Sequence, residues 1–538
     1  MIPHISKPYL KRRLAEYPPP SVADTPLIYA DKLCSWYDSK VTKTDKKANG
    51  QFFTPVSIAR FMAQFNRATN KTIRILDPGA GTGILSCALL EHLVNTPDRP
   101  VSVHLDVFEI DGKAADLLEA CLGFARRWLR KRDVQLKFNV IREDFVLTHA
   151  DVLNPTSSLF KATWLDLYDV VISNPPYFKI SKKDKRAQAS LDVIHGQPNI
   201  YMLFMAISAS LLRDGGYLTF ITPRSFAAGP YFRRFRQYFF EKMCPESIHI
   251  FASRSETFVK DSILQENAIL HARRIHDRCK CVEHGEVRIS QSNGISDLDQ
   301  CLARVVPTAA VFDRSSKDLV LRIPVEKTDD ATSKLINNWQ DRFLSLGLAV
   351  STGPVVPFRA SDLIRTSGNL RGSHAPLLWM QNTKPMRVDW PLNTRKEQYI
   401  TISEASKPLL LPNRNYVLLR RFSAKEDRRR LIAAPLLEGT IASSYIGIEN
   451  HLNYIYRPKG NLTKEEALGI AAILNSKILD EYFRITSGNT QVSATEIRRL
   501  PFPPVSTVKR IGRAISSLAH IEHFESVVSD ILLSDKIR

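Results

Sequence analysis

The sequence predicts an α/β protein: a Rossmann-like fold with a mixed, mostly parallel seven-stranded sheet, followed by a second, mixed α/β domain. Three observations lead to this prediction. Apolar runs of strand length alternate with helical patterns between residues 51 and 275. A glycine-rich turn, Asp77–Gly83, joins the first strand to the first crossover helix. Two late strands have no helix between them, which predicts an antiparallel hairpin at one edge of the sheet.

The length of 538 residues suggests about three domains or two with a linker. Hydrophobic residues make up 44% of the chain and charged residues 24%, which is the composition of a globular protein and excludes a disordered or fibrous one. We expect a basic lead-in over residues 1–50 and the sheet domain over residues 51–275. A linker or peripheral segment is expected over residues 276–340, and a second domain ending in a helix over residues 341–538.

The charge balance points to a polyanionic partner. Lysine and arginine number 75 against 55 acidic residues, a net charge of +20 that favours nucleic acid over acidic proteins or membrane surfaces. No run approaches the roughly 18 apolar residues of a membrane span, and the start lacks an apolar signal core, so a cytoplasmic protein is expected. The 7 cysteines are scattered and odd in number, which argues against a disulfide framework, and Cys279 and Cys281 are expected to be reduced thiols without a metal.

Local patterns define the elements of the sheet domain. Thr54 is expected to cap a helix that has Pro55 at its first position. Strands are expected at residues 73–76, 101–110, 134–141, 170–173, 217–223, 247–251 and 263–272. Helices are expected at residues 56–62, 84–94, 113–132, from 199 to a glycine stop at 214–216, and at 231–243.

The ends of the first three strands carry the residues of a cofactor site. Asp77 precedes three glycines at alternate positions, and a carboxylate there suits an amine or sulfonium better than a pyrophosphate, which favours S-adenosylmethionine over NAD. Glu109 follows the second strand at close to the roughly 20-residue spacing of a ribose-binding carboxylate. Asp144 and Phe145, after the third strand, could accept from an adenine amino group and pack its ring.

The fourth strand leads into Asn174, Pro175, Pro176 and Tyr177. The prolines fix their own φ and move Asn174 out of the helical region, so the carbonyl groups of this segment are free to face a ligand. A rigid carboxamide, a carbonyl and a flat ring could grip a planar group that bears an amino substituent. The lysine-rich segment 179–186 that follows is interpreted either as a phosphate contact or as a solvated loop.

The second domain is less informative. Short apolar runs separated by Gly, Pro, Asn and Ser predict mixed α and β structure, and a helix is expected at residues 465–483. Aromatic residues interleave with arginines, as on a nucleic-acid surface, although most of those aromatics must be core.

In this order, the motifs Asp77–Gly83, Glu109, Asp144–Phe145 and Asn174–Tyr177 resemble the gamma-class N6-adenine DNA methyltransferases of type II restriction-modification systems. In that class the cofactor motifs come first, the Asn-Pro-Pro-Tyr motif follows, and a target-recognition domain comes last. The likeness covers the sheet domain, which would then be catalytic. Two stretches of the second domain, 347–359 and 474–503, also look like the recognition domains of this group.

The resemblance implies a role for each motif residue. S-adenosylmethionine would be held by Thr54, Asp77, Gly79 and Gly81 at its methionine end, Glu109 at its ribose, and Asp144, Phe145 and Phe204 at its adenine. Asn174 and the Pro175 carbonyl would accept hydrogen bonds from the target N6 amino group, with Tyr177 and Phe258 stacking on the flipped base. Methyl transfer would be a direct in-line displacement that needs no metal.

The same resemblance sets the expected partners and the alternatives. The partner would be double-stranded DNA, in the bacterial cytoplasm at the nucleoid, and a cognate restriction endonuclease would share the target without having to bind this chain, which is expected to be monomeric. A protein glutamine N5-methyltransferase has the same Asn-Pro-Pro-Tyr grip but lacks a large C-terminal domain. An RNA methyltransferase, a non-catalytic DNA-binding module and a fused endonuclease fit the residues less well.

Overall fold

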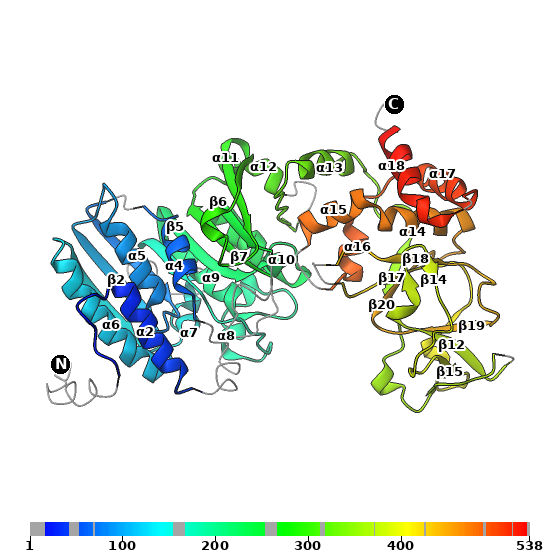
Figure 1. Cartoon of the computed structure of the whole chain (residues 1–538), viewed down its shortest axis with the longest axis horizontal. Coiled ribbons are helices and arrows are strands. Elements are labelled where there is room, and N and C mark those ends of the chain that lie inside the picture. The colour runs from blue at the N-terminus through cyan, green and yellow to red at the C-terminus, as the bar shows by residue number, and fades with distance from the viewer. Residues whose placement is uncertain are drawn as a thin grey trace. The chain divides into compact units, whose positions relative to one another are not determined.

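The computed structural model forms two compact units, Met1–Val325 and Glu326–Arg538 (Figure 1). No helix among the described residues is long and apolar enough to cross a membrane. The structure describes residues 17–41, 53–67, 70–153, 167–252, 266–312, 318–370, 372–423, 427–487, 491–518 and 520–534.

The first unit is built on a sheet with the strand order β3-β2-β1-β4-β5-β7-β6-β8-β9. The five strands from β3 to β5 pair in parallel, and β7 lies antiparallel between β5 and β6. These seven strands form the predicted mixed sheet. The bounds are β1 Thr72–Pro78, β2 Ser102–Phe108, β3 Gln135–Ile141, β4 Tyr168–Ser173, β5 Leu212–Pro223, β6 Met243–Phe251, β7 Asn267–Arg274, β8 Glu286–Ser292 and β9 Ala303–Pro307.

Two further strands lie where the sequence suggested a linker. β8 pairs in parallel with β6, and β9 pairs antiparallel with β8, so the expected edge hairpin is interior. The buried side chains Val287, Ile289 and Val306 join the core, which explains why this polar-looking segment folds with the sheet. The division between the units falls after Val325, inside the segment 276–340 that was expected to be a linker or a peripheral part.

Helices cover both faces of the sheet. Residues of β4 alternate between two cores, with Val171 on the face of α7, α9 and α10, and Val170 and Ile172 on the face of α2, α4, α5 and α6. Burial on both faces explains why β4 is a continuous apolar run. The helices are α2 Pro26–Asp38, α4 Val56–Ala63, α5 Ile84–Val94, α6 Gly112–Arg130, α7 Phe145–His149, α8 Lys185–Gln188, α9 Ile200–Leu211, α10 Arg233–Lys242, α11 Arg278–His284 and α12 Thr308–Val311.

Helix α2 corrects the view of residues 1–50 as a loosely patterned lead-in. The Thr25 hydroxyl caps this helix by accepting from the Ile28 amide, and the side chains of Leu27 and Leu33 are fully buried. The helix packs on α5 and α6, on the blue-to-cyan side of the sheet in Figure 1. Helix α2 is therefore part of the sheet unit's core.

A disulfide bond joins Cys244 of β6 to Cys281 of α11. This contradicts the expectation that Cys281 is a reduced thiol, whereas Cys279 is free and exposed. The pairing could not be predicted because the two cysteines become neighbours only when α11 packs beside β6.

The second unit contains two small sheets with the orders β10-β20-β17-β18 and β11-β15-β12-β19-β16, and a β13-β14 pair. Its strands are β10 Ala349–Thr352, β11 Ile364–Arg365, β12 His374–Leu378, β13 Thr383–Lys384, β14 Arg387–Val388, β15 Tyr399–Thr401, β16 Leu410–Pro412, β17 Tyr416–Arg420, β18 Ala433–Leu436, β19 Tyr445–Ile448 and β20 Leu452–Tyr456. Its helices are α13 Thr328–Asn337, α14 Lys464–Asn475, α15 Lys477–Thr486, α16 Ala494–Arg499, α17 Val505–Ser516 and α18 Phe524–Ser534.

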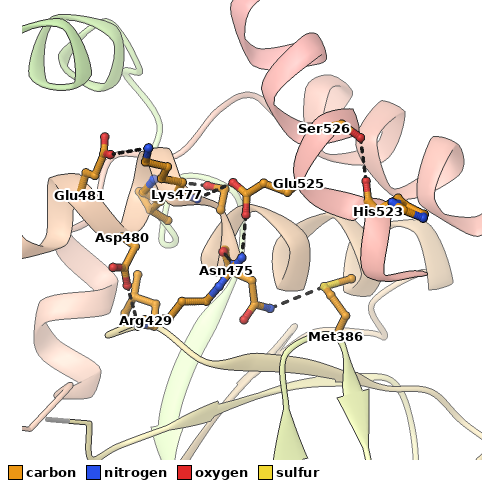
Figure 2. A network of polar contacts seen from close by, with 12 residues as sticks. Met386, Arg429, Asn475, Lys477, Asp480, Glu481, His523, Glu525 and Ser526 are labelled. Atoms are coloured by element: carbon orange, nitrogen blue, oxygen red, sulfur yellow. Dashed lines mark hydrogen bonds and ion pairs between the residues drawn. The ribbon is translucent and has the colours of Figure 1, made fainter. Parts of the chain in front are cut away.

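The helix predicted at residues 465–483 is two helices that meet at Ser476. This residue ends α14 and its hydroxyl caps α15 by accepting from the Leu479 amide. The neighbouring Asn475 carboxamide is fully buried, and its Oδ1 and Nδ2 bond the amide and the carbonyl of Ala433 in β18 at 3.1 and 2.7 Å. Figure 2 shows Asn475 at this junction beside the Arg429–Glu525 ion pair, which joins α18 to it. The turn between the helices is therefore bonded to the sheet.

Candidate functional site

The predicted cofactor and grip residues meet because β3, β2, β1 and β4 are parallel neighbours. Their carboxyl ends lie at one edge of the sheet, where ligands of open α/β sheets bind. A cavity of about 490 Å³ opens at this edge. Its wall contains Thr54, Gly79, Gly81, Glu109, Asp144, Phe145, Asn174, Pro176 and Phe204, nine of the predicted site residues.

The glycine-rich loop is held against the end of β2. The amides of Gly79 and Ala80 both donate to the Phe108 carbonyl at 2.9 Å. Gly79 and Gly81 have φ of +78° and +59°, which residues with a side chain rarely adopt. A Cβ on Gly81 would lie 3.0 Å from the Phe53 ring, so both conformation and space require glycine there.

Glu109 connects this loop to the next helix. Its Oε2 accepts from the Gly81 amide at 2.9 Å and its Oε1 from the Asp111 amide at 2.8 Å. The side chain is 7% exposed, and this burial raises the pKa of Glu109. Each oxygen retains acceptor capacity toward the cavity, as a site for a diol requires.

Asp77 lies behind the loop and not in the cavity wall. It is fully buried, and its Oδ2 accepts from the Ser86 hydroxyl at 2.6 Å at the start of α5. Removal from water raises the pKa of Asp77 to about 7. The Asp77 carboxyl therefore bonds the start of α5 and is not among the groups that line the cavity.

The third strand end supplies a carboxylate and an aromatic floor. Asp144 caps α7, with its Oδ1 accepting from the Val146 and Leu147 amides, and its Oδ2 lies 3.7 Å from Arg186 Nη1. The Phe145 ring packs 5.1 Å from the ring of Phe204. Together these side chains form a wall with one acceptor and two apolar rings.

The grip residue Asn174 is held from two sides. Its Nδ2 donates to the Thr54 hydroxyl at 3.1 Å, and the Tyr177 hydroxyl donates to its Oδ1 at 2.5 Å. Thr54 was expected to cap α4, but the helix begins at Val56 and Thr54 makes no cap bond. The Thr54 hydroxyl instead accepts from the carboxamide of Asn174, the residue that follows β4.

Tyr177 does not line the cavity. Its ring is 8% exposed, and its hydroxyl also lies 2.8 Å from the Ile221 carbonyl oxygen. Burial raises the pKa of Tyr177 well above its usual value, so the hydroxyl remains a donor. Stacking of this ring on a base would require it to leave both oxygen atoms, and Phe258 lies outside the described residues.

Phe178 and Arg186 also line the cavity and were given no role in the cofactor site or the grip from the sequence. Phe178 presents its ring to the cavity, and the Arg186 guanidinium lies 5.6 Å from that ring while pairing with Asp184 at 2.7 Å. Arg186 belongs to the segment expected to contact phosphate or to be solvated. The position of Phe178, directly after the Asn-Pro-Pro-Tyr motif, was the one indication in the sequence that it could belong to the site. Within the described ranges no cluster of His, Cys, Asp or Glu could hold a metal ion.

Comparisons with known proteins give one consistent family. The profile of the Eco57I restriction-modification methylase family matches residues 119–258. The type II methyltransferase M.BsuBI of Bacillus subtilis is 33% identical over 502 residues, covering 91% of this chain and 95% of the relative. The type II methyltransferase M.PstI of Providencia stuartii is 28% identical over 512 residues, covering 95% and 97%.

Two more distant likenesses accompany these. A tRNA1(Val) (adenine(37)-N6)-methyltransferase of Bacteroides thetaiotaomicron is 27% identical over 154 residues, which is 29% of this chain and 53% of that protein. Among solved structures, the DrdV–DNA complex has a TM-score of 0.45 at 14% identity, over 95% of this chain and 60% of that one. Because that TM-score is low, the family assignment rests on the sequence relatives.

Proposed function

The chain belongs to the type II restriction-modification DNA methyltransferases, and we propose that it methylates the N6 amino group of a flipped-out adenine in double-stranded DNA, with S-adenosylmethionine as the donor. Methylation would protect the site from a cognate restriction endonuclease. One observation carries the proposal: the Asn174 carboxamide lies in the wall of the same cavity as Glu109 and Asp144. An amino-group acceptor and a nucleoside site therefore share one space.

The cavity fits the proposed cofactor on chemical grounds. Glu109 offers two acceptors to ribose hydroxyls, and Asp144 one to an adenine amino group, beside the rings of Phe145 and Phe204. Gly79 and Gly81 line the cavity without side chains, which leaves the loop open to close approach of the methionine end. When bound, this cofactor supplies an electrophilic methyl group on a sulfonium.

The chain's own residues would prepare the nucleophile. An exocyclic amino group of adenine is a poor nucleophile because its lone pair is delocalised into the ring. In our proposal, Asn174 Oδ1 and the Pro175 carbonyl accept its two hydrogens, which favours a tetrahedral nitrogen with its lone pair directed at the methyl group. Thr54 and Tyr177 set the carboxamide orientation, so the contribution is positioning in advance of the reaction.

Phe178 extends the proposal to the base itself. Its ring faces the cavity, whereas the Tyr177 ring is buried behind it. We therefore assign stacking on the extrahelical base to Phe178 in this arrangement, and orientation of Asn174 to Tyr177. Stacking would offset part of the few kcal/mol that base extrusion costs.

The choice of adenine in DNA has separate support. One relative, 27% identical over 154 residues, is named as a tRNA adenine N6-methyltransferase. The net charge of +20 suits a polyanion. A protein glutamine methyltransferase, which would use the same grip, would have no evident use for the second unit.

The test identifies the methylated atom. The purified chain is incubated with plasmid DNA and methyl-labelled cofactor, and the DNA is digested to nucleosides. N6-methyl-2′-deoxyadenosine is the expected product, and label on cytosine, or on a release factor but not on DNA, contradicts the assignment. Asn174→Ala should abolish transfer while cofactor binding stays near that of the wild type. Asn95→Ala, an exposed change at the end of α5, is the matched control and should transfer normally.

A further inference from the structure

The second unit presents an aromatic side chain to solvent on a short turn. Phe358 is 76% exposed, and it lies in the 3-10 turn Pro357–Arg359 between β10 and β11. An exposed single apolar residue is ordinary, but a phenylalanine directly after Pro357 in a short turn is less so. The Arg359 guanidinium lies 5.3 Å from the ring centroid. The turn tip therefore combines a flat apolar ring with a fixed positive charge.

Both ends of the turn are anchored. Before the tip, Val355 is fully buried, and its amide and carbonyl bond the Ile448 carbonyl and the Asn450 amide at 3.0 and 2.9 Å. After the tip, Ala360 is 2% exposed and its amide donates to the Val356 and Pro357 carbonyls at 3.1 Å. The chain between Val355 and Ala360 is thus held at both ends, so the ring is presented by a rigid support.

The segment that anchors the turn carries more basic and aromatic side chains. Arg421 Nη1 donates to the Asn450 carbonyl at 3.0 Å, and the Arg421 amide bonds the His451 carbonyl at 2.9 Å. The Phe422 ring lies 5.0 Å from the His451 ring. Arg359 lies in the turn, Arg421 bonds the segment that anchors it, and Asp362 and Arg365 follow the turn in the sequence. This balance complements a polyanion.

We propose that Phe358 is a wedge that inserts between base pairs of the DNA duplex, while Arg359 pairs with an adjacent phosphate. The inference rests on the proposed function because a DNA duplex is the partner that function supplies. Proteins that deform DNA insert apolar side chains such as phenylalanine between base steps, and unstacking at one step eases departure of a base from the helix. A wedge needs a rigid support, and the two anchors provide it.

Binding and unstacking are measured on the full chain without cofactor, so that neither reading depends on the reaction. End-labelled plasmid fragments are titrated with protein, and thymines that become unstacked are mapped by permanganate. We expect Phe358→Ala to weaken binding of the tightest fragment roughly tenfold, as for loss of a base–aromatic stack, and to remove the permanganate-reactive thymines. Phe358→Trp should retain both. Leu344→Ala, which changes an exposed apolar residue of the same unit (84% exposed), should behave as the wild type.

The outcomes separate the alternatives. Wild-type binding and thymine reactivity in Phe358→Ala would overturn the wedge. Binding without reactive thymines in the wild-type protein would also overturn it, because it would show a surface contact without insertion. If Phe358→Ala sediments differently from the wild-type protein in the absence of DNA but still binds DNA as tightly, the result would overturn the wedge and assign Phe358 to a contact between copies of this chain. Methyl label on a base other than adenine would reject the proposed function and leave the wedge readings unaffected.

Discussion

Replacing Thr54 by valine tests whether its hydroxyl positions the grip residue. Thr54 is 5% exposed and its Oγ1 accepts from Asn174 Nδ2 at 3.1 Å. Valine has nearly the same shape, so the change removes the acceptor without opening a cavity. A hydrogen bond of this kind contributes about 1 kcal/mol, and a buried donor left without its acceptor costs up to about 3 kcal/mol. Because about 1.4 kcal/mol is tenfold in rate, we expect methyl transfer to slow by roughly tenfold to a hundredfold.

Single-turnover transfer of labelled methyl to DNA measures this rate, and calorimetric titration measures cofactor affinity. The dissociation constant of the cofactor should change less than the rate, because the hydroxyl is engaged with Asn174 and not with the cofactor. Thr54→Ser keeps the hydroxyl and should retain most of the rate. A valine variant as fast as the wild type, or a serine variant as slow as valine, would refute the positioning role.

Three further predictions concern single side chains. Burial raises the pKa of Asp77 to about 7 from its ordinary value near 4, so the fold loses stability progressively as the pH rises from 4 to 7. Asp77→Asn should therefore become more stable than the wild type over that pH range, by on the order of 4 kcal/mol above pH 7 in denaturant titrations. A stability difference that does not change with pH would contradict this. Glu109→Gln replaces two acceptor oxygens, which bond the Gly81 and Asp111 amides, by a carboxamide with one acceptor oxygen. Cofactor affinity should therefore fall at least tenfold by calorimetry, and an unchanged affinity would remove Glu109 from the site. Asn475→Ala leaves both Ala433 backbone groups buried without the carboxamide and should lower the free energy of unfolding by about 3 kcal/mol in urea, whereas the exposed change Asn461→Ala should cost less than about 0.5 kcal/mol.

The meeting of Glu109 and Asp144 at one edge of the sheet was predictable because it depends only on where their strands end and on the parallel pairing of those strands. Glu109 and Asp144 each end an apolar run, and parallel strands bring such ends to one edge regardless of how side chains pack. The resemblance to a methyltransferase family was confirmed by relatives that cover nearly the whole chain. The alternation of strands and helices was therefore sufficient for the seven central strands of the first unit, but not for α2, β8 and β9.

The direction in which a side chain points was not predictable. Tyr177 and Phe178 are adjacent aromatics, and only the packed structure shows that the first is buried against Ile221 while the second faces the cavity. Threonine is a residue type that often caps helices, yet the Thr54 hydroxyl accepts a hydrogen bond from Asn174 in another segment. Tertiary contacts outweigh local preference in each case. The break at Ser476 was missed for the opposite reason, since the apolar period runs through it and the hydroxyl cap is visible only in the structure.

The insertion of β7 between β5 and β6 has a consequence for the order in which the protein can form during synthesis. The chain leaves the ribosome from its N-terminus, so β6 emerges before the strand that joins it to the rest of the sheet. Until residues 267–274 emerge, β5 has an open edge and β6 has no partner from the earlier sheet. The nascent chain therefore passes through an interval with two unpaired strands, during which chaperone protection matters most. A pause in translation before residues 267–274 have emerged would lengthen that interval, and one after they have emerged would not.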